Sequence, residues 1–86
     1  MKTQFSRHAR HRLKLYEISK DDILEILAND GAESRPLNER RELISDAFVA
    51  KYGWPILVTY VREMHGIEVI TNFPYDRNTL YEDIIR

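Results

Sequence analysis

Hydrophobic positions near the start of the chain recur every three to four residues, which is the period of an α-helix. Between residues 5 and 16 they form one narrow stripe, spanning about 80° on a helix of about 3.6 residues per turn. The stripe consists of Phe5, Ala9, Leu13 and Tyr16. His8 and Arg12 border it, four residues apart. We therefore predict an amphipathic helix over residues 5–16.

A second helix is predicted to begin at Ser19, a residue type that favours the N-cap. Asp22 follows at the third position, which is a variant of the capping box. Asp21 and Asp22 also suit the positive end of the helix dipole. The segment Asn29-Asp30-Gly31 contains residue types that favour a C-cap, so the helix is expected to end there.

After Gly31 the hydrophobic period changes to that of strands. We predict a short strand over residues 32–37, limited by Pro36, and then a charged turn over residues 38–42. Alternating apolar residues predict another strand over residues 43–52, with Asp46 on its apolar face.

The strongest predicted strand is Ile56–Met64, which is dense in β-branched and aromatic residues. A tight turn at His65-Gly66 would lead to the return strand Ile67–Phe73, which Pro74 ends. The tail from Asp76 to Arg86 fits either a short helix starting near Asn78 or a flexible arm.

This order of elements predicts one α+β domain over residues 1–86. Two N-terminal helices would cover one face of an antiparallel sheet of about four strands, as in a two-layer domain. The other face would be exposed, or covered by the tail or by a second copy in a homodimer.

Composition agrees with a globular domain and excludes several classes of protein. Hydrophobic residues make up 43% and charged residues 31% of the 86 residues. The absence of an 18-residue apolar run excludes a membrane span, and the N-terminus lacks the apolar region of a secretory signal. Without Cys there are no disulfides, thiolate metal sites or cysteine nucleophiles. We expect a cytoplasmic location.

Charge is unevenly distributed along the chain. Residues 1–16 contain five Lys or Arg and no acid, whereas the other 70 residues carry eight bases against 14 acids. A basic end on an acidic body predicts local contact with a polyanion, or self-association through complementary charge.

The N-terminal pattern resembles that of a widespread family of small bacterial proteins of unknown function. It reads Ser6-x-His8-Ala9-x-x-Arg12-Leu13, followed by Ile18-Ser19-x-x-Asp22-Ile23. In the family a second Arg and a Gly stand where this chain has Tyr16 and Glu17. The end of the family pattern is similar to Pro55–Tyr60 and to Val69-Ile70-Thr71-x-x-Pro74, so the likeness covers roughly residues 5–74.

The resemblance implies a RelE-like or barnase/EndoU-like domain. That broader group includes toxins of toxin–antitoxin pairs that cut RNA without a metal, so RNA and a cognate antitoxin are the partners it implies.

His8 and Arg12 are the leading candidate catalytic residues. Metal-free cleavage of RNA needs a base near the 2′-hydroxyl, an acid near the leaving oxygen and cations around the phosphate. An imidazole can transfer protons at neutral pH, and a guanidinium binds phosphate through a fixed fork. We predict proton transfer by His8, a phosphate clamp at Arg12 and a further phosphate contact from the hydroxyl of Thr71. The structural alternative is that His8 hydrogen-bonds to the sheet and Arg12 pairs with an acid such as Glu17.

Further residues are predicted to bind RNA rather than react with it. They are Arg7, Arg10, Lys14, Tyr60 and Arg62. Arg62 is two residues after Tyr60, hence on the same face of a strand, where it is a candidate to replace the missing family Arg. Arg40-Arg41 is interpreted as a solvated turn, and His65 as an exposed turn residue. No metal site is expected, because His11 faces away from His8 and no carboxylate accompanies them.

Two functions follow from these observations. The first is a toxin-like, metal-independent endoribonuclease or RNA-binding domain with no cofactor. The second is a non-catalytic module, such as an inhibitor, antitoxin-like or accessory protein, that binds a protein through its sheet or tail. The acidic body favours the second, and the His–Arg spacing favours the first.

Overall fold

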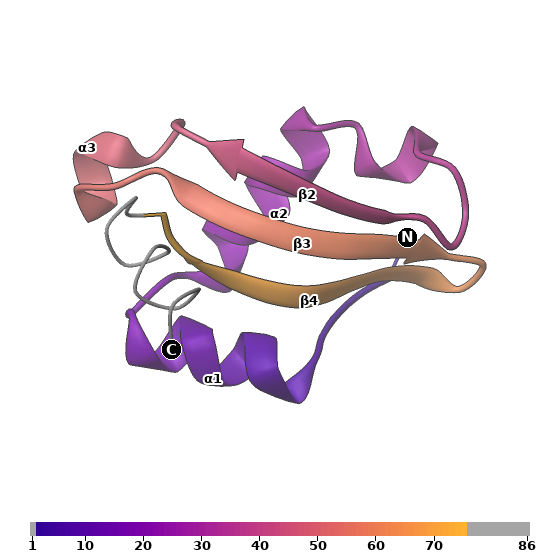
Figure 1. The fold of residues 1–86 in the computed structure, drawn as a ribbon, viewed down its shortest axis with the longest axis horizontal. Helices are drawn as coiled ribbons and strands as arrows, with labels where there is room; N and C mark the ends of the chain where they lie inside the picture. The colour runs from indigo at the N-terminus through magenta and orange to yellow at the C-terminus, as the bar shows by residue number, and fades with distance from the viewer. Residues whose placement is uncertain (1, 76–86) are drawn as a thin grey trace, which may run out of the picture.

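A computed structural model describes residues 2–75 of the chain, and the predicted helix or arm after Asp76 lies outside them. Within this range three α-helices and four strands form an α+β domain, as predicted (Figure 1). The elements are β1 (Lys2–Phe5), α1 (Arg7–Leu15), α2 (Lys20–Asn29), a short 3₁₀ helix η1 (Ala32–Ser34), β2 (Arg40–Ser45), α3 (Val49–Tyr52), β3 (Ile56–Glu63) and β4 (Gly66–Pro74).

The four strands form one mixed sheet in the order β1-β4-β3-β2. β2, β3 and β4 are antiparallel, as the sequence predicts, whereas β1 runs parallel to β4 and was not predicted. The pairing of β3 with β4 shifts by one residue between Thr59 and Tyr60, so that Thr59 pairs with Thr71 whereas Tyr60 pairs with Val69. Ile70 is the extra residue, and this bulge changes which side chains of β4 face the helices.

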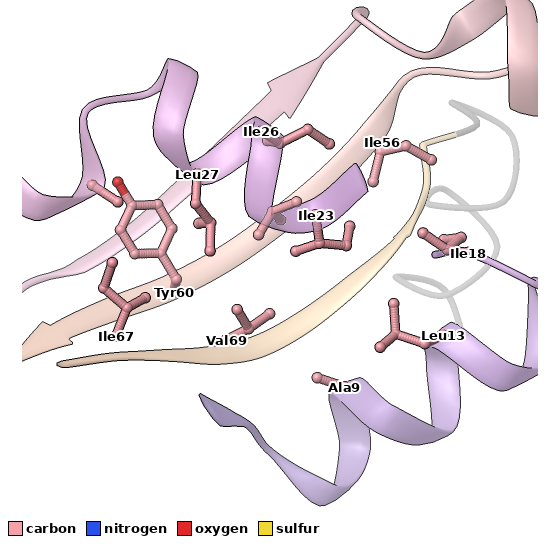
Figure 2. Packing of buried hydrophobic residues seen from close by; sticks show 12 residues of the cluster. Ala9, Leu13, Ile18, Ile23, Ile26, Leu27, Ile56, Tyr60, Ile67 and Val69 are labelled. Carbon is pink, nitrogen blue, oxygen red and sulfur yellow. The ribbon is translucent and has the colours of Figure 1, made fainter. Parts of the chain in front are cut away.

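α1 and α2 pack on the same face of the sheet and share one core (Figure 2). In Figure 1, α2 lies behind the sheet and α1 runs beside β4. The helices contribute Ala9, Leu13, Ile23, Ile26 and Leu27, and the strands contribute Ile56, Val58, Tyr60, Ile67 and Val69. All of these side chains are at most 6% exposed, so their burial is the main force that holds the two layers together.

Four predicted segments between residues 5 and 52 differ from the structure. Phe5 is the last residue of β1 rather than part of the first helix. Residues 32–37 contain the 3₁₀ turn Ala32–Ser34 instead of a strand, because Gly31 with φ of 68° reverses the chain directly before it. The predicted turn over residues 38–42 already contains β2, and the predicted strand over 43–52 ends at Ser45 and is followed by α3.

The C-terminus of α1 is closed by the hydrogen bonds of a Schellman motif. The N–H of Ile18 donates to the carbonyl of Leu13 over 2.9 Å, and that of Glu17 donates to Lys14 over 3.4 Å. Ile18 and Leu13 are both buried, which supplies the apolar contact of the motif. Glu17 therefore occupies the left-handed position, with φ of 54°, where glycine is usual.

The predicted start of α2 is confirmed at Ser19. Its hydroxyl accepts a hydrogen bond from the N–H of Asp21 over 3.2 Å, and its own N–H donates to the hydroxyl of Tyr52 in α3. The Tyr52 hydroxyl in turn donates to Asp22, which also forms an ion pair of 2.6 Å with Lys51. These bonds attach α3 to the N-terminus of α2.

Candidate functional site

Ser6 fixes the start of α1 against β4. Its N–H donates to the carbonyl of Val69 over 2.9 Å, and its hydroxyl donates to the carbonyl of Ile70 over 2.7 Å. The same hydroxyl accepts the N–H of Ala9 over 3.0 Å, which makes Ser6 the N-cap of α1. One side chain thus sets both where the helix begins and where it meets the sheet.

α1 runs along the second half of β4 from this point. Ala9 accepts a hydrogen bond of 3.5 Å from the buried side chain of Asn72, and the guanidinium of Arg12 lies 5.1 Å from the ring centre of Phe73. Successive residues of α1 therefore contact successive residues of β4, from Ser6 beside Ile70 to Arg12 beside Phe73. We call the part of α1 that carries His8 and Arg12, together with Phe73 of β4, the α1–β4 strip.

His8 and Arg12 have different surroundings within this strip. The side chain of His8 is exposed and makes no hydrogen bond to another described residue. Arg12 is half-buried, and its guanidinium lies near two aromatic rings, 5.1 Å from the ring centre of Phe73 and 6.0 Å from that of Tyr16. The expected alternative, a pair between Arg12 and Glu17, is not formed in the described part of the chain. Both rings are within cation–π distance of the guanidinium, and its N–H groups form no hydrogen bond to another residue in the range 2–75.

Thr71 belongs to β4, where it is directly opposite Thr59 of β3. Its Oγ1 atom is buried and has no hydrogen-bond partner among residues 2–75. The next residue, Asn72, is completely buried, and its Oδ1 atom is likewise unpaired in that range. The hydroxyl of Thr71 is therefore not at the surface, and no hydrogen bond joins it to His8 or Arg12 within residues 2–75.

The remaining surface of α1 is basic. Arg7, Arg10 and Lys14 are exposed, and the helix, with the sequence RHARHRLKL, contains no acidic residue. Arg12 and Lys14 lie in its last turn, where a positive charge is favourable for the helix dipole. The exposed surface of α1 therefore carries positive charge from these three cations.

Tyr60 and Arg62, which the sequence also suggested for RNA binding, belong to a different cluster. The hydroxyl of Tyr60 is 2.5 Å from Oδ2 of Asp30, at the end of α2. Arg62 donates through Nη1 to the carbonyl of Arg35 over 2.8 Å. The two side chains share a face of β3, as predicted, but the structure does not bring them together with His8 and Arg12.

Asp30 is the centre of this second cluster, which we call the Asp30 cluster. Arg41 donates to both carboxylate oxygens, over 2.6 and 2.8 Å, and Arg35 donates over 3.2 Å. The hydrogen bonds from Arg41, with help from Tyr60 and Arg35, outweigh burial and lower the pKa of Asp30 from 3.8 to about 2. Burial and the bond to Asp30 raise the pKa of Tyr60. The cluster joins the end of α2 to β2 and β3.

Sequence reasoning missed the Asp30 cluster for two reasons. Asp30 was interpreted only as a C-cap residue, and Arg41 as part of a solvated turn. The sequence from Arg40 to Ser45 has no alternation of apolar and polar residues that would have marked a strand. In the structure half-buried and exposed residues alternate there, and Arg41 is on the half-buried side. His65 is exposed in the turn between β3 and β4, as predicted.

Other kinds of site were also sought over residues 2–75. These residues contain no group of three His, Cys, Asp or Glu side chains that would hold a metal ion. No helix among them is long and apolar enough to cross a membrane. Comparison of the chain with protein-family models, curated proteins and solved structures finds no match. The proposal for function therefore depends on the arrangement of the side chains described above.

Proposed function

We propose that this chain is a toxin-like, RNA-binding domain that cleaves RNA without a metal, with α1 as its RNA-binding element. The observation that carries the proposal is the surface of α1, which exposes His8 among Arg7, Arg10 and Lys14 and has no acid. Phosphate groups are the polyanion repeat that such a surface attracts, and affinity grows with each cation that meets one.

The other residues of the N-terminal sequence pattern have roles in folding, and this contrast supports a chemical role for His8. Ser6 and Ser19 cap the two helices, and Ala9, Leu13 and Ile18 are buried in the core. These positions are explained by folding alone. His8 is exposed and contributes to neither a cap nor the core, so a role in folding does not account for it.

The left-handed backbone conformation of Glu17 supports the resemblance to the family from which the toxin-like function is proposed. The family pattern has Gly where this chain has Glu17, and Glu17 adopts φ of 54° as the C′ residue of α1. Only glycine takes this conformation without steric cost. The family pattern and the observed backbone therefore agree at a position where the side chains differ.

In the proposed reaction the 2′-hydroxyl attacks the adjacent phosphorus, and the bond to the 5′-oxygen breaks. His8 either accepts the proton of the 2′-hydroxyl or donates a proton to the leaving 5′-oxygen, and solvent water transfers the other proton. Arg12 stabilises the charge that develops on the phosphate. Arg7, Arg10 and Lys14 hold neighbouring phosphates. Thr71 remains a predicted phosphate ligand, and because its hydroxyl is buried the proposal depends on His8 and Arg12.

Cleavage of a mixed RNA in the presence of EDTA tests this proposal. We expect the wild-type chain to bind RNA at low salt and His8→Ala to lower the cleavage rate by about 10²-fold or more. His65→Ala is the matched control, since it removes another exposed histidine far along the chain. Absence of RNA binding at low salt would refute the proposal, and cleavage unchanged in His8→Ala would move the chemistry to other residues.

A second candidate is a non-catalytic module that binds a protein. The observation in its favour is a set of large apolar side chains exposed near the β2–α3 end, with Ile44 and Trp54 both 49% exposed. For this function, a stable complex with the product of a neighbouring gene should survive His8→Ala and be lost in Trp54→Ala. A complex lost in His8→Ala would instead assign the partner to α1.

A further inference from the structure

β2 is an edge strand whose outer side is open. The sheet order ends at β2, so its outward N–H and C=O groups pair with no other strand of residues 2–75. Its six residues keep an uninterrupted register with β3 and contain neither proline nor a bulge. Such an edge is a template for pairing with another strand, because its hydrogen-bonding groups are already aligned.

We propose that β2 pairs with β2 of a second copy of this chain, in an antiparallel manner, to form a continuous eight-stranded sheet. A twofold axis perpendicular to the sheet keeps the helices of both copies on the same side. Residues directly opposite in an antiparallel pair point to the same face, and the faces alternate along β2. The axis must therefore pass midway between one residue of β2 and the same residue of the second copy, which stand directly opposite each other.

The charges of the side chains decide which of the four central residues of β2, from 41 to 44, lies at the axis. An axis at Glu42 places the two Glu42 carboxylates opposite each other. An axis at Arg41 places the two Arg41 guanidinium groups opposite each other and leaves the end of β2 unpaired. An axis at Ile44 places Glu42 opposite Asp46 of the second copy. Each of these registers opposes like charges, which destabilises a strand pair.

An axis at Leu43 avoids every such conflict. Leu43 then meets Leu43 of the second copy, Glu42 meets Ile44, and Arg40 meets Asp46 twice by symmetry. Arg40 and Asp46 are exposed and form no ion pair with other residues in the described part of the chain. Ile44, 49% exposed in one copy, gains an aliphatic neighbour in the stem of Glu42. This register also pairs every residue of β2.

Single cysteines test the register, because the natural chain contains none. Leu43→Cys brings two thiols to directly opposite positions, where the Cα atoms are about 4.5–5.5 Å apart, within the range of a disulfide. Under mild oxidation we expect Leu43→Cys to form a covalent dimer. Glu42→Cys and Ile44→Cys should form little covalent dimer, since two residues of offset separate their thiols. Equal or faster crosslinking at position 42 or 44 would overturn the register.

Charge exchange tests the interface itself. In sedimentation velocity over a range of concentrations, we expect the wild type to dimerise and Arg40→Asp or Asp46→Arg to weaken the dimer by roughly tenfold, because each reversal acts twice. The double variant restores opposite charges and should restore the dimer. Glu25→Arg on the exposed side of α2 is the control and should dimerise like the wild type. A monomeric wild type, or a double variant that is not restored, would overturn the proposal.

Discussion

Replacement of Asp30 by Asn should remove most of one acid-sensitive contribution to stability. The Asp30 side chain is only 10% exposed and accepts hydrogen bonds from Arg41, Arg35 and Tyr60. Together these bonds hold its pKa at about 2 instead of 3.8. A carboxyl group with a lowered pKa stabilises the folded state above its unfolded pKa, and this contribution is lost as the pH falls through the folded pKa.

The size of the contribution follows from the two pKa values. The fall from 3.8 to about 2 corresponds to at most about 2.5 kcal/mol of stability at neutral pH. The side chains of Arg41 and Arg35 are 37% and 38% exposed, so water screens the pairs. We therefore expect about 1–2 kcal/mol from the carboxylate charge of Asp30. This part of the stability should disappear between about pH 5 and pH 2.

Urea unfolding followed by circular dichroism at several pH values measures this contribution. We expect Asp30→Asn to be less stable than the wild type by about 1–2 kcal/mol at pH 7, with the difference shrinking toward pH 2. Glu25→Gln, an equivalent carboxylate-to-amide change on the exposed side of α2, serves as the control for general charge effects. A difference between wild type and Asp30→Asn that is as large at pH 2 as at pH 7 would refute this reasoning.

Two backbone positions give further predictions. Glu17→Gly should raise the free energy of unfolding by about 0.5–1 kcal/mol, because glycine relieves the left-handed φ of 54° at the end of α1; an unchanged or lower melting temperature would contradict this. Gly66→Ala should destabilise the chain by about 2–4 kcal/mol, since a Cβ there would overlap the carbonyl oxygen of Lys2. Faster amide exchange in β1 would locate the damage, and exchange as slow as in the wild type would count against it.

The parts of the fold that the sequence predicts are those with strong local signals. Ile56–Met64 has a long run of β-branched and aromatic residues, and the structure has β3 over Ile56–Glu63. Ser19 and the acidic residues after it define the start of α2. In both cases the residues that determine the element lie within it, so no distant contact is needed to predict it.

Other parts depend on contacts between distant residues. β1 has four residues, and it is a strand because it lies against β4, more than 60 positions later in the chain. The residues of β2 were divided between a predicted turn and a longer strand, because Arg40 and Arg41 are polar enough to suggest a solvated turn. Propensity is a weak guide where tertiary pairing decides the conformation.

The candidate site also contains residues that local patterns predict and residues whose positions depend on distant contacts. The basic surface of α1 follows from helical periodicity, and Arg7, Arg10 and Lys14 are exposed as that periodicity requires. In the Asp30 cluster Arg41 is 11 and Tyr60 is 30 positions from Asp30, so local patterns do not reveal these contacts. The strand of Tyr60 and Arg62 likewise does not indicate their partners, Asp30 and the carbonyl of Arg35.

Chemical-shift mapping of the ¹⁵N-labelled chain with a short single-stranded RNA locates the RNA-binding surface residue by residue. We expect the largest changes at low salt in α1, from Arg7 to Leu15, and in β4 beside Phe73. We also expect these changes to weaken in Arg12→Ala and as the salt concentration rises. Changes that are absent at low salt, or that centre on the Asp30 cluster or on β2, would contradict the assignment of RNA binding to α1.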